Sequence, residues 1–184
     1  LESNELVGNC QKIPQNQFEK VLLSINQIIE NLNQIQTSIK SINHHCNIVF
    51  TISPVRHLRD GISENLLSKS HLIVALQSFI SQNPQCYYFP SYEIFNEELR
   101  DHRYFELDLA HPNKLAIDYI FNRLTEVYGD EKFREYIFKA GALSQLLRHE
   151  LKTTDQEQIE KWQQSLNLKK KEFQTIYPTC KIPT

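Results

Sequence analysis

Hydrophobic and polar positions alternate along the first part of the chain with two different periods. Residues 19–43 carry apolar side chains at helical spacing, with Asn, Gln and Ser on the opposite face, which predicts an amphipathic helix. Residues 47–53 form a continuous β-rich run that ends at Pro54, a pattern typical of a buried strand in a parallel sheet. The sequence therefore predicts a helix followed by a buried strand.

The next segment repeats this alternation. A helix is predicted from about Ser63 to Ser81, followed by a short buried strand at residues 86–89 and a helix near residues 91–99. Strands that alternate with helices predict an α/β fold, in which crossover helices join the strands of a parallel sheet. Only two or three strands are visible, fewer than a complete sheet contains. Because the chain also contains no Met, we expect further strands upstream of Leu1.

A further helix is predicted from about residue 112 to residue 128, with Pro112 in its first turn, where the missing N–H costs nothing. Residues 130–184 differ in character, because they are charged, helical in pattern and poor in strand signals. We therefore divide the chain into an α/β part at residues 1–129 and a helical extension at residues 130–184, which we expect to pack on it.

Composition narrows the classes of function. The chain has 184 residues, 40% of them hydrophobic and 23% charged, which suits one domain with a sizeable core. A formal net charge of -2 and the lack of a basic stripe argue against nucleic-acid binding. Neither an apolar run of about 18 residues nor a signal peptide is evident, so we expect a cytoplasmic protein without a membrane span. The four cysteines are far apart and form no zinc-type pair, and we expect no metal.

The most informative motif is Asp108-Leu109-Ala110-His111-Pro112. If the intervening residues bend as a short turn or open a helix, the Asp108 carboxylate can reach the His111 imidazole. It then accepts from one ring N–H and leaves the other ring nitrogen free as a general base. The alternative is a solvated turn ahead of a helix. Asp108 and His111 are thus the candidate orienter and base of a serine hydrolase, and no nucleophile for them is evident in the chain.

Six short segments follow one another in a distinctive order: residues 8–14 (GNCQKIP), 51–61 (TISPVRHLRDG), 65–69 (NLLSK), 88–94 (YFPSYEI), 98–104 (ELRDHRY) and 108–112 (DLAHP). Together they resemble the GSCFA-domain family, a branch of the SGNH/GDSL-like hydrolases. The Gly-Ser-Cys-Phe-Ala motif that names the family is absent, so the chain resembles the C-terminal part of that domain. A smaller departure is Gln11, where family members often have His.

The resemblance implies a three-layer α/β/α sandwich with a short parallel sheet, of the SGNH/flavodoxin-like kind. It implies metal-independent and cofactor-free ester hydrolysis or acyl transfer on a small-molecule or carbohydrate ester. The serine nucleophile is then expected upstream of this chain. A non-catalytic binding or scaffolding module on the same fold is the alternative. Because an incomplete sheet exposes an edge and an apolar face, we also expect association with another copy of the chain.

Polar residues near predicted strand ends are further candidates. Asn9 lies in a loop after a short apolar step, where its amide could donate to an oxyanion or, alternatively, serve a tight turn beside Gly8. Arg56 and His57 follow the first strand, at the edge where open α/β sheets bind ligands. They are candidates for contact with an anionic or carbohydrate substrate.

A set of charged residues is expected to support these groups. Asp60 would orient its loop, or form a structural pair with Arg59. Glu93, Arg100 and Arg103 are candidates for a Glu–Arg network that buttresses the catalytic turn, with a solvated charged surface as the alternative.

Hydroxyl and amide side chains near the strand ends are expected to have structural roles. Asn65, Ser68 and Lys69 share one face of the predicted helix and are expected to form hydrogen bonds at its start. Ser53 and Ser91 lie at strand ends but lack the G-x-S-x-G elbow of an exposed nucleophile.

Overall fold

The computed structural model describes residues 14, 17–149, 151–153 and 155–182. The chain divides into two compact units, Leu1–Ile120 and Phe121–Thr184. The division falls inside the helix α4, Lys114–Tyr128, nine residues before the boundary predicted between residues 129 and 130. Each unit is described by itself below.

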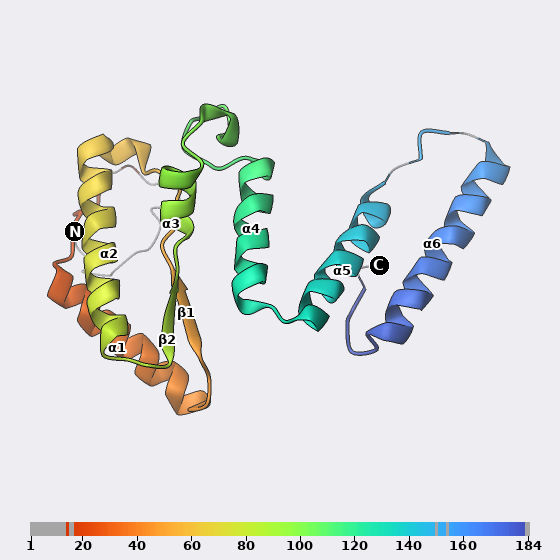
Figure 1. The fold of residues 1–184 in the computed structure, drawn as a ribbon. Coiled ribbons are helices and arrows are strands. Elements are labelled where there is room, and N and C mark those ends of the chain that lie inside the picture. The colour runs from red at the N-terminus through yellow and green to blue at the C-terminus, as the bar shows by residue number, and fades with distance from the viewer. Residues whose placement is uncertain (1–13, 15–16, 150, 154, 183–184) are drawn as a thin grey trace. The chain divides into compact units, whose positions relative to one another are not determined.

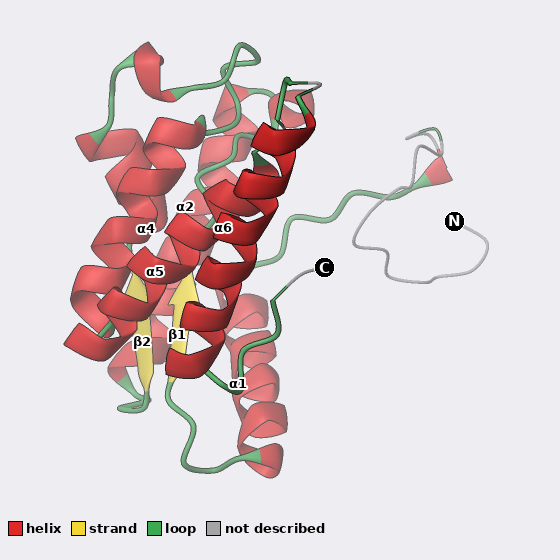
Figure 2. Ribbon diagram, turned by 90° about the vertical axis from the view of Figure 1, so that its right-hand side faces the viewer, coloured by secondary structure: helices red, strands yellow, loops and turns green. Residues whose placement is uncertain are grey.

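Unit 1 contains the predicted alternation of helices and strands. Its elements are α1 (Ile25–Ile42), β1 (Ile48–Thr51), α2 (Ile62–Ser81) and β2 (Cys86–Phe89), drawn in Figure 1. The two strands are parallel, and their register runs from Ile48 opposite Cys86 to Thr51 opposite Phe89. Within the described residues the sheet has these two strands, coloured yellow in Figure 2. The expectation of an α/β fold with a parallel sheet is confirmed.

The first helix begins later than its apolar pattern predicts. Ser24 is the N-cap of α1, because its hydroxyl accepts from the Gln27 N–H while the Gln27 amide oxygen accepts from the Ser24 N–H. This reciprocal capping box ends the preceding extended segment. Val21 precedes the cap and is 66% exposed, so the helical spacing over residues 19–23 was misleading.

The main core of unit 1 lies between α1, α2 and the two strands. Its buried members are Ile48, Ile52, Leu76, Phe79 and Cys86, and apolar side chains of α1 pack against them. The Phe50 and Phe79 rings meet edge to face with their centroids 5.7 Å apart. This core anchors the end of β1, from which the candidate site begins.

A second, smaller core lies after β2. The helix α3 (Ser91–Glu93) widens at Ile94–Glu98 into a π-helical turn, in which the Leu99 N–H donates to the Ile94 carbonyl at 2.9 Å. Figure 1 labels α3, the first part of this segment. Three buried residues, Phe95, Leu99 and Ala116, then join this segment to the start of α4.

The start of α4 corrects the prediction for Pro112. The helix begins at Lys114, and the Asn113 side chain accepts from the Ala116 N–H at 3.2 Å, which is the bond of an N-cap. Pro112 lies before the cap in an extended bridge with Phe105, outside the helix. The segment that carries Asp108 and His111 is therefore a loop that ends before the helix.

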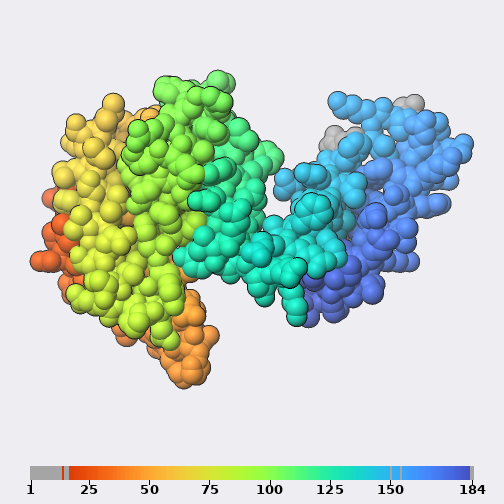
Figure 3. All heavy atoms as spheres, viewed as in Figure 1, coloured from red at the N-terminus to blue at the C-terminus, as the bar shows by residue number. Residues whose placement is uncertain are grey.

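Unit 2 is helical, as predicted. It contains α5 (Glu131–Arg148) and α6 (Gln156–Ile176), which pack side by side in the space-filling view (Figure 3). Asp130 and Asp155 cap their first turns by accepting backbone N–H groups. No helix among the described residues is both long enough and apolar enough to cross a lipid bilayer.

Candidate functional site

Asp108 and His111 lie in a short hairpin-like loop. Phe105 and Pro112 form an antiparallel bridge at its base, and the Glu106 N–H donates to the His111 carbonyl at 2.8 Å. Leu109 turns the chain at the tip with φ of 55°, in the left-handed region that a leucine rarely adopts. We call residues 105–112 the catalytic hairpin, after the role that we propose for Asp108 and His111. The turn at its tip brings residues 108 and 111 together, and the left-handed conformation of Leu109 makes this turn unfavourable in backbone free energy.

The Asp108 carboxylate is held by three hydrogen bonds from within the hairpin. One oxygen accepts from the Ala110 N–H at 2.9 Å and the His111 N–H at 3.0 Å. The other oxygen lies 2.6 Å from His111 Nδ1. The two backbone N–H groups, that of His111 first, and then the imidazole lower the pKa of Asp108 to about 2. The carboxylate is therefore ionised near neutral pH and acts only as an acceptor.

This geometry fixes the orientation of the imidazole. Because Asp108 can only accept, Nδ1 of His111 is the donor of the 2.6 Å bond. A neutral His111 ring then has its lone pair on Nε2. The His111 side chain is 59% exposed. The predicted reach of the carboxylate to the imidazole is present, and it occurs in a turn rather than in a helix.

Arg56 packs on the catalytic hairpin from the loop that follows β1. Its backbone N–H donates to the Ala110 carbonyl at 3.3 Å, and its Nη1 lies 3.4 Å from the Leu109 carbonyl. Its guanidinium lies over the Phe105 ring, 4.7 Å from the centroid. The structure thus brings Arg56 to the hairpin. His57, the next candidate, is exposed, and its N–H donates to the Asn65 side chain at 2.9 Å.

The end of β1 is held by buried side chains that the sequence reasoning had not singled out for this role. Lys69 is 4% exposed, and its ammonium donates to the Ser53 carbonyl at 2.7 Å. Burial lowers the pKa of Lys69. The buried Ser91 hydroxyl donates to the Ile52 carbonyl at 2.8 Å and lies 2.5 Å from the Thr51 hydroxyl. Ser91 is therefore a strand-end support.

Comparison with protein families identifies the chain. A family profile, that of the GSCFA family, matches residues 1–124. The chain belongs to the GSCFA family. No curated protein and no solved structure matches it. The GSCFA match covers β1, β2 and the catalytic hairpin, and it ends inside α4.

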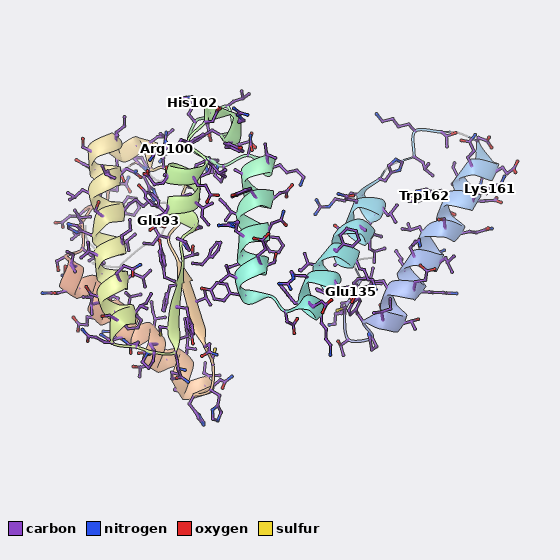
Figure 4. The ribbon with its side chains drawn as sticks, in the orientation of Figure 1. Glu93, Arg100, His102, Glu135, Lys161 and Trp162 are labelled. Atoms are coloured by element: carbon purple, nitrogen blue, oxygen red, sulfur yellow. The ribbon has the colours of Figure 1, made fainter. Side chains whose placement is uncertain are left out.

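The predicted Glu–Arg network does not form among the described residues of this GSCFA chain. Figure 4 labels Glu93 on α3 and Arg100 in the segment after it. The Tyr88 hydroxyl donates to both oxygens of Glu93, at 2.9 and 2.7 Å. Burial, and after it the hydrogen bond to Glu93, raises the pKa of Tyr88. Arg100 instead pairs with Glu97, three residues earlier in the sequence. The prediction was wrong because Glu93 and Arg100 each interact with a residue that is closer in the sequence.

Arg103 and Asp60, the other supporting charges, also have ion-pair partners. Arg103 pairs with Asp101 at 2.8 Å, two residues away. Asp60 lies 2.8 Å from the Lys20 ammonium, so its ion-pair partner is Lys20 rather than Arg59. Asp60 therefore ties its loop to the segment before α1. These pairs are largely exposed and contribute little to stability.

Two further predictions concern Asn9 and metal binding. Asn9, the candidate oxyanion donor of the GSCFA domain, lies outside the described residues. Within the described part of the chain, no three His, Cys, Asp or Glu side chains gather where they could share a metal ion.

Proposed function

We propose that this GSCFA chain supplies the general base and its orienter for an SGNH-type serine hydrolase. The observation that carries the proposal is the Asp108–His111 pair, with its 2.6 Å bond through Nδ1 and its exposed His111 side chain. The reaction is ester hydrolysis or acyl transfer on a small-molecule or carbohydrate ester. The serine that attacks the ester comes from outside residues 1–184.

The proposed chemistry follows from the free nitrogen of His111. As the serine oxygen bonds to the ester carbonyl carbon, Nε2 accepts the hydroxyl proton, and Asp108 stabilises the resulting imidazolium. The imidazolium then gives this proton to the departing alcohol as the ester bond breaks. In the second half, Nε2 takes a proton from water, or from an acceptor alcohol, which attacks the acyl-enzyme. The serine regains its proton when the acyl group leaves.

We further propose the three-layer SGNH-type sandwich as the fold of the complete domain. The parallel pair of β1 and β2 supports this, because each strand leads directly into residues at one edge of the sheet. Arg56 follows β1, and the buried Ser91 follows β2. We propose that Arg56 and His57, which follow β1, contact the substrate at this edge, and that Asn9 donates to the oxyanion.

Labelling of the full-length protein with a fluorophosphonate, read by intact mass, tests the function. We expect one adduct on a serine outside residues 1–184, and loss of labelling in His111→Ala by about 10²- to 10⁴-fold, the usual contribution of a general base. His102→Ala is the matched control, because His102 is an exposed histidine that precedes the catalytic hairpin by a few residues. It should label at the wild-type rate.

The alternative is a binding or scaffolding module that keeps the fold without chemistry. It predicts no adduct on a folded full-length protein, or an adduct whose rate is the same in wild type and His111→Ala. Either result overturns the hydrolase proposal.

A further inference from the structure

Lys69 is a buried charge that the proposed chemistry does not use. It lies on α2 with only 4% of its surface exposed, and its ammonium donates to the Ser53 carbonyl at 2.7 Å. Burying an ammonium costs free energy that one carbonyl offsets only in part. A lysine at this position therefore calls for a role that an apolar side chain would not fill.

α2 holds the loop after β1 at two points. Lys69 binds the Ser53 carbonyl at the start of the loop, and Asn65 accepts from the His57 N–H at 2.9 Å at its end. Asn65 and Lys69 are four residues apart and therefore lie on one face of α2. Between these points the Ser53 hydroxyl accepts from the Val55 N–H at 3.3 Å. Residues 53–57 are thus fixed to the helix at both ends.

The same loop carries Arg56, which contacts the catalytic hairpin through its backbone and its side chain. The Arg56 N–H donates to the Ala110 carbonyl, and the guanidinium reaches the Leu109 carbonyl and the Phe105 ring. Leu109 and Ala110 lie between Asp108 and His111 in the sequence. A continuous set of contacts therefore runs from the Lys69 ammonium to the tip of the hairpin.

We propose that Lys69 is a positioning residue for the Asp108–His111 pair, acting through Ser53 and Arg56. The bond between Asp108 and His111 is closed inside the hairpin and does not need Lys69. What Lys69 sets is the place of the whole hairpin relative to the end of β1, the edge at which the proposed nucleophile must meet Nε2. This inference rests on the proposed function for its catalytic consequence, but its structural part can be measured separately.

The test uses Lys69→Met in the full-length protein, with Lys114→Met as the matched control. Lys114 is an exposed lysine on α4 that pairs with Asp118. In Lys69→Met we expect amide hydrogen exchange at Arg56 to rise at least about tenfold, because the bond to Ala110 opens more often. We expect the maximal fluorophosphonate labelling rate to fall by up to about 100-fold, at an unchanged half-saturating reagent concentration. Lys114→Met should match wild type in both measurements.

A double-mutant cycle tests the route through Arg56. Arg56→Gln alone should lower the labelling rate, and the double variant with Lys69→Met should lower it no further than the stronger single variant. If the two substitutions lower the labelling rate additively, Lys69 does not act through Arg56. If Lys69→Met does not fold, Lys69→Gln replaces it, because its shorter neutral side chain keeps polar character but does not reach Ser53.

The outcomes separate this inference from the proposed function. Wild-type exchange at Arg56 in a folded Lys69 variant overturns the positioning role, whatever the labelling shows. A Lys69 variant that only melts earlier, but labels at the wild-type maximal rate, also overturns it. A wild-type protein that never labels overturns the proposed function, while Arg56 exchange still reports whether Lys69 holds the hairpin.

Discussion

Asp101 and Asp108 lie in neighbouring exposed turns, and both have a carboxyl pKa lowered to about 2. The causes differ. For Asp101 the largest is the hydrogen bond from the Arg103 guanidinium, at 2.8 Å. For Asp108 the largest is the backbone N–H of His111, followed by that of Ala110, and the imidazole comes third. The Asp101 carboxylate therefore pairs with a permanent cation. The Asp108 carboxylate accepts hydrogen bonds from two backbone N–H groups and from the His111 imidazole.

The difference between these turns lies in what the partner can do. A guanidinium does not release a proton near neutral pH, so the Asp101–Arg103 pair can only be structural. An imidazole gains and loses a proton in that range, so the Asp108–His111 pair can serve as a base. A low carboxyl pKa therefore does not distinguish a catalytic turn from a structural one, whereas the chemistry of the partner does.

The largest expected effect separates the two aspartates by function. Asp108→Asn replaces an acceptor with an amide that can donate, so the Nε2–H tautomer of His111 becomes favourable and the base is lost. We expect fluorophosphonate labelling of the full-length protein to fall by up to about 10⁴-fold. Asp101→Asn should label at the wild-type rate. Equal losses in the two variants would mean that the turns do not differ in role.

The next effect concerns the apolar support of the catalytic hairpin. Phe95 is fully buried and packs against Phe105, with the two rings tilted and their centroids 4.5 Å apart. Phe95→Ala should lower the free energy of unfolding by about 3–5 kcal/mol. Leu107→Ala, at a fully exposed position in the same hairpin, should change it by less than about 0.5 kcal/mol. Denaturant titration measures both, and a large loss at Leu107 would contradict the assigned packing.

A smaller effect is expected at the residue that joins the two turns. The Asn113 side chain donates to the Arg103 carbonyl at 2.7 Å and caps α4 by accepting from the Ala116 N–H. Asn113→Ala should therefore cost about 1 kcal/mol of stability, the usual value of an N-cap. Asn122→Ala, at an exposed position within α4, is the control and should be nearly neutral. Equal changes would show that Asn113 is not a cap.

The smallest effect is a difference in titration. Both pKa values lie below the ordinary 3.8, so each set of contacts is complete above that pH and is lost as pH falls through about 2. In His111→Ala, the two backbone donors of Asp108 remain, and its pKa should stay well below 3.8. In Arg103→Ala, Asp101 loses the guanidinium hydrogen bond that lowers its pKa most, so the pKa of Asp101 should rise further than that of Asp108. Carboxyl carbon NMR measures both, and the reverse order would contradict the assigned causes.

The sequence predicted the elements where local pattern and burial agree. The short strand at residues 86–89 was correct at both ends, because an unbroken apolar run is enclosed between Pro84 and Pro90. The start of α1 was wrong, because apolar residues before Ser24 imitate the helical period while remaining exposed. The Ser24–Gln27 spacing of a capping box was the available signal.

The site was predictable only where its contacts are local. Asp108 and His111 are three residues apart, so their approach depends on one turn. The burial of Lys69 and the contact of Arg56 with the hairpin depend on segments far apart in the chain, which spacing cannot reveal. The prediction of a Glu–Arg network failed for a related reason. Arg100 and Arg103 each form an ion pair with a carboxylate within three residues in the sequence, rather than with Glu93.

Exchanging the partners of the two aspartates tests the central claim most directly. His111→Arg gives Asp108 a permanent cation, as at Asp101, while Arg103→His gives Asp101 an imidazole. We would compare the fluorophosphonate labelling rates of the two folded full-length variants with wild type. The account predicts that His111→Arg loses labelling although an ion pair to Asp108 is retained, and that Arg103→His labels like wild type. Wild-type labelling in His111→Arg would contradict it, because the pair would then serve only as a structural bridge.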